Sequence, residues 1–564
     1  MLARTALIRR LRAKDVPEVL IIGGGINGVG AYRDLAAQGV AALLVEAGDF
    51  SSGTSAAPSR LIHGGLRYLE TGEAALVRES LTERNLLLKN ACHVVHPLPC
   101  WVPLRSWFGG SVGAVLRFLR LKRTPGKKGA VPVKIGLMLY DRFGRVNQTM
   151  PDHRMLTAAQ ARAEVGILAP DIRVVGEYYD ARISHPERLV MELVADAEAD
   201  CPLSMAVPYL VAGAQGQGRI TLTCRITGEV FEVTPKIVIN ASGAWVDGVQ
   251  ADLGLRDRLI GGTRGSHLVL RHRQLAEALD DKMLYFETDD HRACLIYRLA
   301  EDRVLLGTTD IRSDDPGDKQ CTEAEVDYLF KVLKPILPGI TLSRADIVFA
   351  FAGVRPLPKA EVGATGAISR DHRLVQFART PDRPFDLITL VGGKWTTYRV
   401  CAEQMADAVL QKLGRKRVKD TTGLAIGGAA GLPVAAEPRR AWVAALARET
   451  GLPLARCQVL AVRYGSRARA VALAERAAPE AFAHLEGYSP AEIRLICTDE
   501  RVTRLQDIVL RRTLMGFEGH GARAALAELA QVAGAVLGWD AARLAQELDA
   551  TLELLRNRHM MAIA

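Results

Sequence analysis

The chain has little of several features that mark whole classes of protein. Aromatic residues make up only 5% of its 564 residues, and no basic stretch carries interleaved aromatic side chains on which bases could stack. No apolar run reaches the roughly 18–20 residues that a membrane-spanning helix needs. The arginine-rich first residues lack the apolar core of a secretory signal. We therefore expect neither a nucleic acid partner nor a transmembrane segment.

The nine cysteines include no CxxC pair of the kind that binds zinc or cycles between thiol and disulfide. Cys92 and Cys100 flank His93 and His96, but this spacing fits no common zinc site. We expect no bound metal, and reduced cysteines as in a cytosolic protein.

The charge balance is the first positive signal. A net charge of +10 and an isoelectric point of about 9.2 favour an anionic partner: nucleic acid, acidic lipid or a phosphorylated substrate. The low aromatic content makes nucleic acid the weakest of the three. A chain of 564 residues with 49% hydrophobic residues can also form two or three domains with sizeable cores.

The most informative segment is the glycine turn at residues 23–28, Gly-Gly-Gly-Ile-Asn-Gly. It follows an apolar run (19–22) and precedes a helix-like stretch (29–38), and a second apolar run (40–45) ends at an acid. Strand, glycine turn, helix, strand and acid in this order are typical of a dinucleotide site.

Each of these residues has a physical reason to be there. Gly23 permits the tight turn, and Gly28 lets the helix pack against the strand. Gly25 lets a pyrophosphate approach the helix N-terminus, where free N–H groups attract anions. Glu46 can accept hydrogen bonds from the two hydroxyls of an adenosine ribose.

Further along, the pattern predicts three kinds of structure. The middle of the chain is strand-rich, with strands expected at 219–224, 230–233, 237–239, 267–270, 293–297, 304–307 and 347–351. The turns between them favour an antiparallel sheet. Residues 421–438 have the composition of a linker, and from about 439 onward helical spacing of apolar residues predicts an all-helical C-terminal domain.

Residues 104–146 stand apart in composition. They contain ten basic residues and one acid, Asp141, which gives a net charge of +9, and apolar residues lie between the charges. This pattern favours a basic amphipathic segment that binds an anionic membrane surface. The alternative is a solvated basic face over a buried helix.

Seven segments together make the chain resemble the FAD-dependent glycerol-3-phosphate dehydrogenases of the aerobic, quinone-linked type. They run in family order and comprise residues 22–28, 61–69, 240–245, 265–267, 307–310, 353–357 and 392–399. The resemblance implies an α/β fold with a Rossmann-like FAD-binding domain and an antiparallel β-sheet substrate domain. We expect these two domains to be interleaved within residues 15–420 and followed by the helical domain, 436–564.

The resemblance also implies a set of FAD contacts, in which Gly64 and Gly65 would lie against the flavin and the segment 392–397 would supply a helix N-terminus for its N1–C2 edge. The expected cofactor residues are Gly23, Gly25, Asn27, Gly28, Glu46, Thr54, Ser55, His63, Gly64, Gly65, Ser242, Gly243, Gly392, Gly393, Lys394 and Thr396.

For the substrate, the resemblance gathers Arg355, Arg370 and Lys394 around a phosphate, with Arg67 and Tyr68 nearby. His267 is the candidate for orienting the hydroxyl or accepting its proton, since a neutral imidazole can do so near pH 7. Arg67 is its rival as the catalytic group, through stabilisation of a developing alkoxide.

The leading interpretation is an enzyme that oxidises sn-glycerol 3-phosphate to dihydroxyacetone phosphate and passes the electrons to a membrane quinone. We expect it in the cytoplasm, bound peripherally to the inner face of the cell membrane, and a homodimer is compatible with the resemblance. Three alternatives stay open: an oxidase that reduces oxygen to hydrogen peroxide, a binding or tRNA-modifying flavoprotein, and a nicotinamide enzyme.

Overall fold

The computed structural model describes residues 3–70, 72–109, 129–215, 219–290, 292–359 and 371–563. Two predictions fall outside these residues. One is the phosphate contact of Arg370, and the other is the central part of the basic segment, with Arg117, Arg120, Lys122 and Arg123.

The N-terminal βαβ unit belongs to a six-stranded sheet of order β18-β19-β11-β1-β2-β7. Its strands are β1 (Val19–Ile22), β2 (Ala42–Glu46), β7 (Met205–Pro208), β11 (Ile237–Asn240), β18 (Arg373–Phe377) and β19 (Asp386–Val391). All neighbours run parallel except β18 and β19. This arrangement confirms the Rossmann-like prediction.

Both faces of this sheet are buried, and alternate residues serve different cores. Ile21 and Leu44 pack under helices α2 (Ile26–Ala37), α8 (Pro186–Asp200) and α12 (Tyr398–Lys412). Leu20 and Leu43 face a three-stranded sheet of β8 (Leu210–Gln215), β9 (Arg219–Cys224) and β10 (Val230–Val233). In β9, Ile220, Leu222 and Cys224 are buried, as the predicted alternation requires.

One detail of the strand prediction is wrong. Strand β11 pairs in parallel with β1 and β19 and does not join the antiparallel sheet expected for the middle of the chain. All four of its residues are buried, which is usual for parallel strands covered on both faces.

A larger sheet of ten strands forms the second half of the molecule, and it is antiparallel except where β4 runs parallel to β13. Its strands are β3 (Leu61–Ile62), β4 (Val95–Leu104), β5 (Arg154–Thr157), β6 (Val174–Ile183), β12 (Ile260–Arg271), β13 (Met283–Glu287), β14 (Ala293–Ala300), β15 (Arg303–Gly307), β16 (Ile311–Arg312) and β17 (Ile347–Pro358). The four strands predicted between residues 267 and 351 all lie in it.

Helices cover this sheet on both faces. Helices α3 (Leu66–Glu70), α4 (Ala74–Asn90) and α6 (Ala130–Gly144) pack on one face, and α10 (Arg273–Leu279) and α11 (Glu323–Leu333) share a core with the other. The other short elements are α1 (Arg4–Arg12), α7 (Ala158–Glu164), α9 (Val246–Asp252), η1 (Thr54–Ala56), η2 (Gly243–Trp245), η3 (Arg344–Asp346), η5 (Gly427–Ala429) and η6 (Gly465–Arg467).

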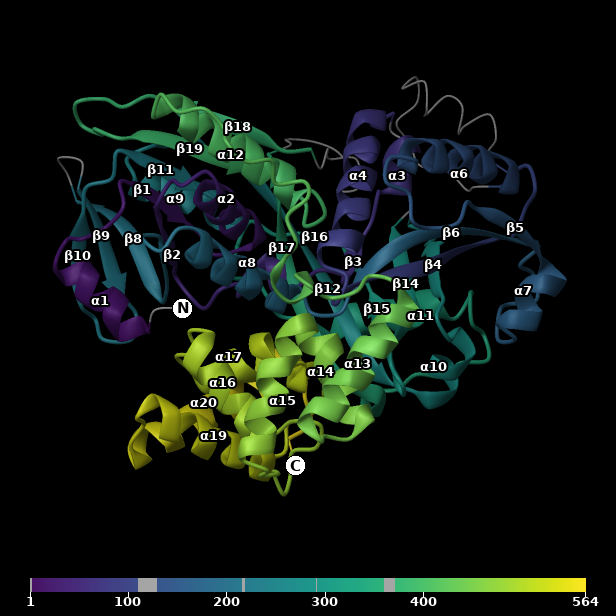
Figure 1. Cartoon of the computed structure of the whole chain (residues 1–564). Helices are drawn as coiled ribbons and strands as arrows, with labels where there is room; N and C mark the ends of the chain where they lie inside the picture. The colour runs from purple at the N-terminus through teal and green to yellow at the C-terminus, as the bar shows by residue number, and fades with distance from the viewer. Residues whose placement is uncertain are drawn as a thin grey trace.

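From residue 436 onward the described chain is helical, as predicted, and it gathers on one side of the molecule, coloured green to yellow in Figure 1. The helices are α13 (Ala436–Thr450), α14 (Leu454–Tyr464), α15 (Ala468–Ala477), α16 (Pro490–Asp499), α17 (Leu505–Asp507), the π-helical turn η7 (Ile508–Arg512), α18 (Met515–Glu518), α19 (Arg523–Leu537) and α20 (Ala541–His559). The boundaries 15–420 and 436–564 stay a prediction.

The helical part is anchored to the N-terminal sheet by buried charges. Arg511 and Arg512 both donate hydrogen bonds to Asp49, which follows β2, and Arg512 Nη1 lies 2.7 Å from the Asp49 carboxylate. The two arginines hold the pKa of Asp49 below its usual range although burial opposes this. The loop after β2 is thereby fixed from the far end of the chain.

Candidate active site

A cavity of about 1490 Å³ lies between the carboxyl ends of the parallel strands and the large sheet. It exceeds the roughly 300–1,000 Å³ of ordinary ligand pockets, so it has room for an extended ligand and a second molecule. Of the described residues that the sequence assigns to the site, all but Gly28 and Gly64 line it.

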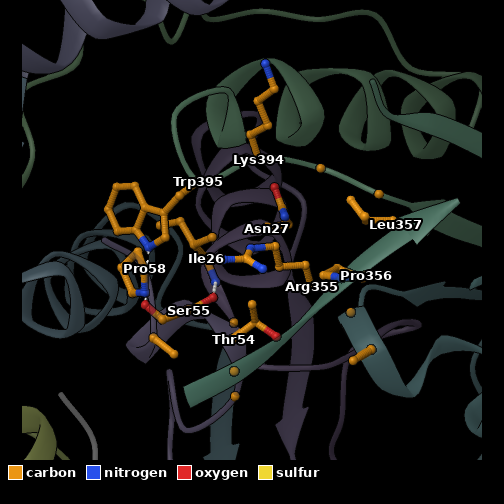
Figure 2. A pocket seen from close by; sticks show the side chains of 18 of the residues that line it. Ile26, Asn27, Thr54, Ser55, Pro58, Arg355, Pro356, Leu357, Lys394 and Trp395 are labelled. Carbon is orange, nitrogen blue, oxygen red and sulfur yellow. Dashed lines mark hydrogen bonds between the residues drawn. The ribbon is translucent and has the colours of Figure 1, made fainter. Parts of the chain in front are cut away.

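The glycine turn forms one end of the cavity. Gly23 has a φ of +111°, and a Cβ on Gly28 would lie 1.9 Å from the carbonyl oxygen of Gly23. Gly28 therefore acts behind the cavity wall, by allowing α2 to pack against β1. Helix α2 begins at Ile26, whose N–H donates to Ser55 Oγ over 2.9 Å, as Figure 2 shows.

Glu46 and Lys319, which carry opposite charges, both line the cavity near this end. The Glu46 carboxylate accepts hydrogen bonds from the N–H groups of Gly24 (2.7 Å) and Gly48 (2.8 Å), so each oxygen keeps a lone pair for a further donor. Burial raises the pKa of Glu46 above its usual value, although these two hydrogen bonds oppose the rise.

Lys319 was not predicted from the sequence. Its Nζ lies 4.4 Å from the centroid of the Trp245 ring and donates to the carbonyl oxygen of Ser52 over 3.3 Å. Burial, and then the charge of Arg558, lower its pKa to about 8. No motif marks this lysine, because 273 residues separate it from Glu46.

A second helix N-terminus faces the cavity at α12. Gly392 and Gly393 precede it with φ of +81° and +96°, which glycine adopts without strain. Thr397 occupies the N-cap, but its side chain makes no capping bond. Thr396 Oγ1 instead accepts a hydrogen bond from the N–H of His63 over 3.3 Å and ties the two loops together.

The segment 63–65 is supported from behind by residues that the sequence did not indicate. The N–H of Gly64 donates to Tyr140 Oη (2.9 Å) and to Asp180 Oδ1 (3.1 Å), and Arg84 Nη1 lies 3.0 Å from Asp180. A Cβ on Gly64 would lie 2.3 Å from Leu81 Cδ2, which explains why only glycine fits there.

A buried oxygen marks the cavity as a place for a polar ligand. Asn27 lines the cavity, and within the described residues its Oδ1 has no hydrogen-bond partner. Such groups are rare in folded proteins unless a ligand or water satisfies them. With two helix N-termini and the Glu46 carboxylate, these residues fit a dinucleotide with an attached polar ring.

Two other predicted cofactor residues already use their hydroxyl groups in hydrogen bonds within the protein. Thr54 Oγ1 donates to the carbonyl oxygen of Val354 (2.5 Å), and Ser242 Oγ donates to Asn240 Oδ1 (2.6 Å), although Thr54 and Ser242 both line the cavity. The indole N–H of Trp395 donates to the carbonyl oxygen of Ser55 (3.3 Å; Figure 2).

The structure separates Arg355 and Lys394, two of the residues predicted to bind the phosphate. Arg355 Nη1 lies 3.1 Å from Asp310 Oδ1, and its Nη2 donates to Thr308 Oγ1 over 3.0 Å. Lys394 Nζ lies 3.9 Å from the ring centroid of Tyr68 and donates to Ser80 Oγ over 3.3 Å. In Figure 2 the Lys394 side chain extends away from Arg355.

The local sequence explains the place of Arg355. It pairs with Thr263 across β12 and β17, and a Cβ on the next inward residue of β12, Gly265, would lie 2.0 Å from Arg355 Nη2. Glycine at that position leaves room for the guanidinium. Arg67, the other predicted cation, also lines the cavity from α3.

His267 is held on β12 with 1% of its surface exposed. Its ring stacks on Phe351 (centroids 4.8 Å apart, planes 9° apart), and its Nε2 lies 2.7 Å from Ser59 Oγ. Burial, and then the charge of Arg355, lower the pKa of His267 to about 3. The ring is therefore neutral at neutral pH.

Comparison with known proteins agrees with this geometry. A family model described as FAD dependent oxidoreductase matches residues 18–408, and one described as the C-terminal domain of alpha-glycerophosphate oxidase matches residues 419–544.

Relatives cover most of the chain. A glycerol-3-phosphate dehydrogenase of Synechocystis sp. is 35% identical over 421 residues, which is 71% of this chain and 70% of that protein. One from Pseudomonas tolaasii is 31% identical over 512 residues, 89% of this chain and 92% of that protein. The solved glycerol-3-phosphate dehydrogenase from Bacillus halodurans, complexed with FAD, shares the fold with a TM-score of 0.73 at 22% identity and covers 98% of both chains. The chain therefore belongs to the family of FAD-dependent glycerol-3-phosphate dehydrogenases, and its cofactor is FAD.

Proposed function

We propose that the enzyme oxidises sn-glycerol 3-phosphate to dihydroxyacetone phosphate and passes the electrons to a membrane quinone. The observation that supports a phosphorylated substrate is the lining of the cavity. Beyond the dinucleotide cradle it is lined by Arg67, Arg355 and Lys394 together with a neutral histidine, His267. Cations suit a phosphate, and a neutral imidazole suits a hydroxyl.

Each residue has a separate task in this reaction. FAD, when bound, accepts the hydride from carbon. Arg355 binds the phosphate oxygens and so orients the substrate, Arg67 stabilises negative charge on the reacting oxygen, and Lys394 adds positive charge to the cavity from its place over Tyr68. His267 accepts the hydroxyl proton, because its ring is neutral in the free enzyme and has a nitrogen lone pair to receive it.

The electron acceptor is tested by reoxidation. The enzyme is reduced with glycerol 3-phosphate without oxygen and then mixed with either a quinone in liposomes or air-saturated buffer. We expect the quinone to restore the oxidised flavin spectrum much faster than oxygen does. Rapid reoxidation by oxygen with one hydrogen peroxide per flavin would support the oxidase alternative, which the name of the C-terminal family model favours.

The described part of the basic segment carries an apolar surface, which we propose as the route to the quinone. Trp107 and Phe108 after β4, and Ile135 and Met138 on α6, are between 51% and 75% exposed. On the opposite side of α6, Val133, Leu137 and Tyr140 are buried. The N–H of Val131 donates to the carbonyl oxygen of Trp107 over 3.0 Å, so the two parts form one surface.

Exposed lysine and arginine side chains accompany this surface at Lys134, Arg142 and Arg145. An apolar face with basic residues beside it is typical of interfacial membrane binding. Among the described residues, no helix is both long and apolar enough to cross a bilayer. We propose that this surface binds the anionic face of the membrane in which the quinone is dissolved.

Changing Ile135 to Glu should weaken binding to anionic vesicles by about tenfold or more, since burying such a side chain contributes roughly 1.5–3 kcal/mol. The measurement is co-sedimentation with vesicles over a range of lipid concentrations. Val462→Glu is the matched control, because Val462 is 49% exposed on α14, outside this surface. Equal binding by both variants and the unchanged enzyme would remove α6 from the membrane contact.

Removing the charge of Lys319 should weaken FAD binding. We expect Lys319→Met to raise the dissociation constant about tenfold, or about 1.4 kcal/mol, because it removes a partly desolvated cation from the cofactor end of the cavity. Fluorescence titration of the deflavinated protein measures this. Lys331→Met on the exposed side of α11 is the control and should bind FAD normally.

The pH dependence of FAD binding has a defined sign. An anionic cofactor favours the protonated lysine, so affinity should be constant below pH 8 and decline above it, where the free lysine loses its proton. Lys319→Met should lose this decline. A decline of the same size in the variant would assign it to another group.

A further inference from the structure

The imidazole of His267 packs between its two cross-strand neighbours, Phe351 and Gly307, which hold the ring in place. One face stacks on Phe351. On the other side, a Cβ on Gly307, its cross-strand partner, would lie 2.2 Å from His267 Cδ2. Any proton that passes between this ring and the cavity must therefore use a nitrogen in its present position.

Only one of the two ring nitrogens offers such a path. Nε2 lies 2.7 Å from Ser59 Oγ. Nδ1 is buried and has no hydrogen-bond partner among the described residues. Ser59 is half-buried and lines the cavity, so the hydroxyl that contacts Nε2 belongs to a residue that can also meet the substrate.

The position of Ser59 is itself fixed by residues from several elements. Its carbonyl oxygen accepts a hydrogen bond from Tyr297 Oη over 3.1 Å. The next residue, Arg60, is 1% exposed with a φ of +54°, and its guanidinium lies 3.1 Å from Glu187 and 3.8 Å from the Phe517 ring centroid. This support keeps the Ser59 hydroxyl aimed at a rigid imidazole, which is the geometry that fast proton transfer needs.

We propose that Ser59 is a catalytic residue that relays the substrate's hydroxyl proton to His267; the inference rests on the function proposed above. The O–H bond of the substrate breaks as its proton bonds to Ser59 Oγ, while the proton of Ser59 moves to His267 Nε2. The C–H bond breaks at the same carbon, its hydrogen and electron pair leave as hydride to oxidised FAD, and the C–O bond becomes a carbonyl. His267 ends as the imidazolium.

The charge of Arg355 couples the proposed proton relay to phosphate binding. Arg355 of β17 is the charged group that lowers the pKa of His267, in addition to burial, and Arg355 is also a proposed phosphate ligand. A bound phosphate would offset the guanidinium charge and make Nε2 a better proton acceptor. Glycerol, which lacks the phosphate, should therefore be oxidised slowly even at saturating concentration.

The test compares Ser59→Ala and Ser59→Thr in the FAD-loaded enzyme. The unchanged enzyme is first reduced by glycerol 3-phosphate without oxygen; if it is not, the proposed function fails and the relay with it. If it is, Ser59→Ala should be reduced roughly 10²–10⁴-fold more slowly, the span for general acid–base groups. Ser59→Thr, which keeps a hydroxyl, should recover most of the rate, and adding His267→Ala to Ser59→Ala should cause little further loss.

A second measurement does not depend on turnover. In protein labelled with ¹⁵N-histidine, the relay requires that His267 carry its proton on Nδ1 and accept a hydrogen bond at Nε2. The Nε2 signal should therefore shift in Ser59→Ala, while the FAD spectrum and the affinity for dihydroxyacetone phosphate stay unchanged. A proton found on Nε2 in the unchanged enzyme, or near-normal reduction of Ser59→Ala, would overturn the relay and leave the proposed function standing. Equal slowness of the Ala and Thr variants with an unshifted Nε2 signal would also overturn it.

Discussion

Replacing His267 with alanine should slow anaerobic flavin reduction by glycerol 3-phosphate roughly 10²–10⁴-fold, because a positioned proton acceptor contributes about that much. The imidazole packs between Phe351 and Gly307 with its Nε2 on Ser59 Oγ, and the substitution removes that nitrogen. Stopped-flow absorbance of the flavin at saturating substrate measures the rate.

The FAD content of His267→Ala should stay unchanged. His272→Ala is a matched control, since His272 follows β12 on the same segment and its Nδ1 accepts only the capping bond from the N–H of Leu275. His272→Ala should be reduced at the normal rate. Near-normal reduction of His267→Ala would return His267 to a structural role and leave Arg67 as the catalytic candidate.

Replacing Arg355 with alanine should lower the binding affinity for glycerol 3-phosphate by roughly 10- to 150-fold, because a hydrogen bond to a charged group contributes about 1.5–3 kcal/mol. The affinity for glycerol should hardly change. The structure adds a second cause of loss: Asp310, now 3.1 Å from the guanidinium, would lose this ion pair and keep its negative charge near the phosphate.

A double variant separates the two causes. Arg355→Ala with Asp310→Ala should recover part of the affinity, since it removes the repulsion but not the missing donor. Arg344→Ala, which disrupts the exposed ion pairs of Arg344 with Asp327 and Glu323, is the control and should bind normally. Equal losses for glycerol and glycerol 3-phosphate in Arg355→Ala would show that this arginine does not bind the phosphate.

Local patterns in the sequence were sufficient for much of the fold. The glycine turn at 23–28, the alternation in β9 and the helical spacing after residue 439 all depend on neighbouring residues. The parallel pairing of β11 was missed because strand direction depends on partners that are distant in sequence: β1 and β19 lie more than 140 residues away on either side.

The same limit applies to the site. Motifs identified some of the residues that line the cavity, but the sequence could not show which of them would meet. The contact of Ser59 with His267 spans 208 residues, and Asp180 reaches the N–H of Gly64 across 116. The separation of Lys394 from Arg355 likewise depends on Lys394 packing over Tyr68.

The most direct single test is the addition of glycerol 3-phosphate to the purified, FAD-loaded enzyme in the absence of oxygen. One equivalent per flavin should bleach the yellow colour and yield dihydroxyacetone phosphate, while glycerol at the same concentration should leave the spectrum nearly unchanged. A flavin that stays oxidised with glycerol 3-phosphate, or that is bleached equally well by glycerol, would contradict the assignment of this cavity to a phosphorylated polyol.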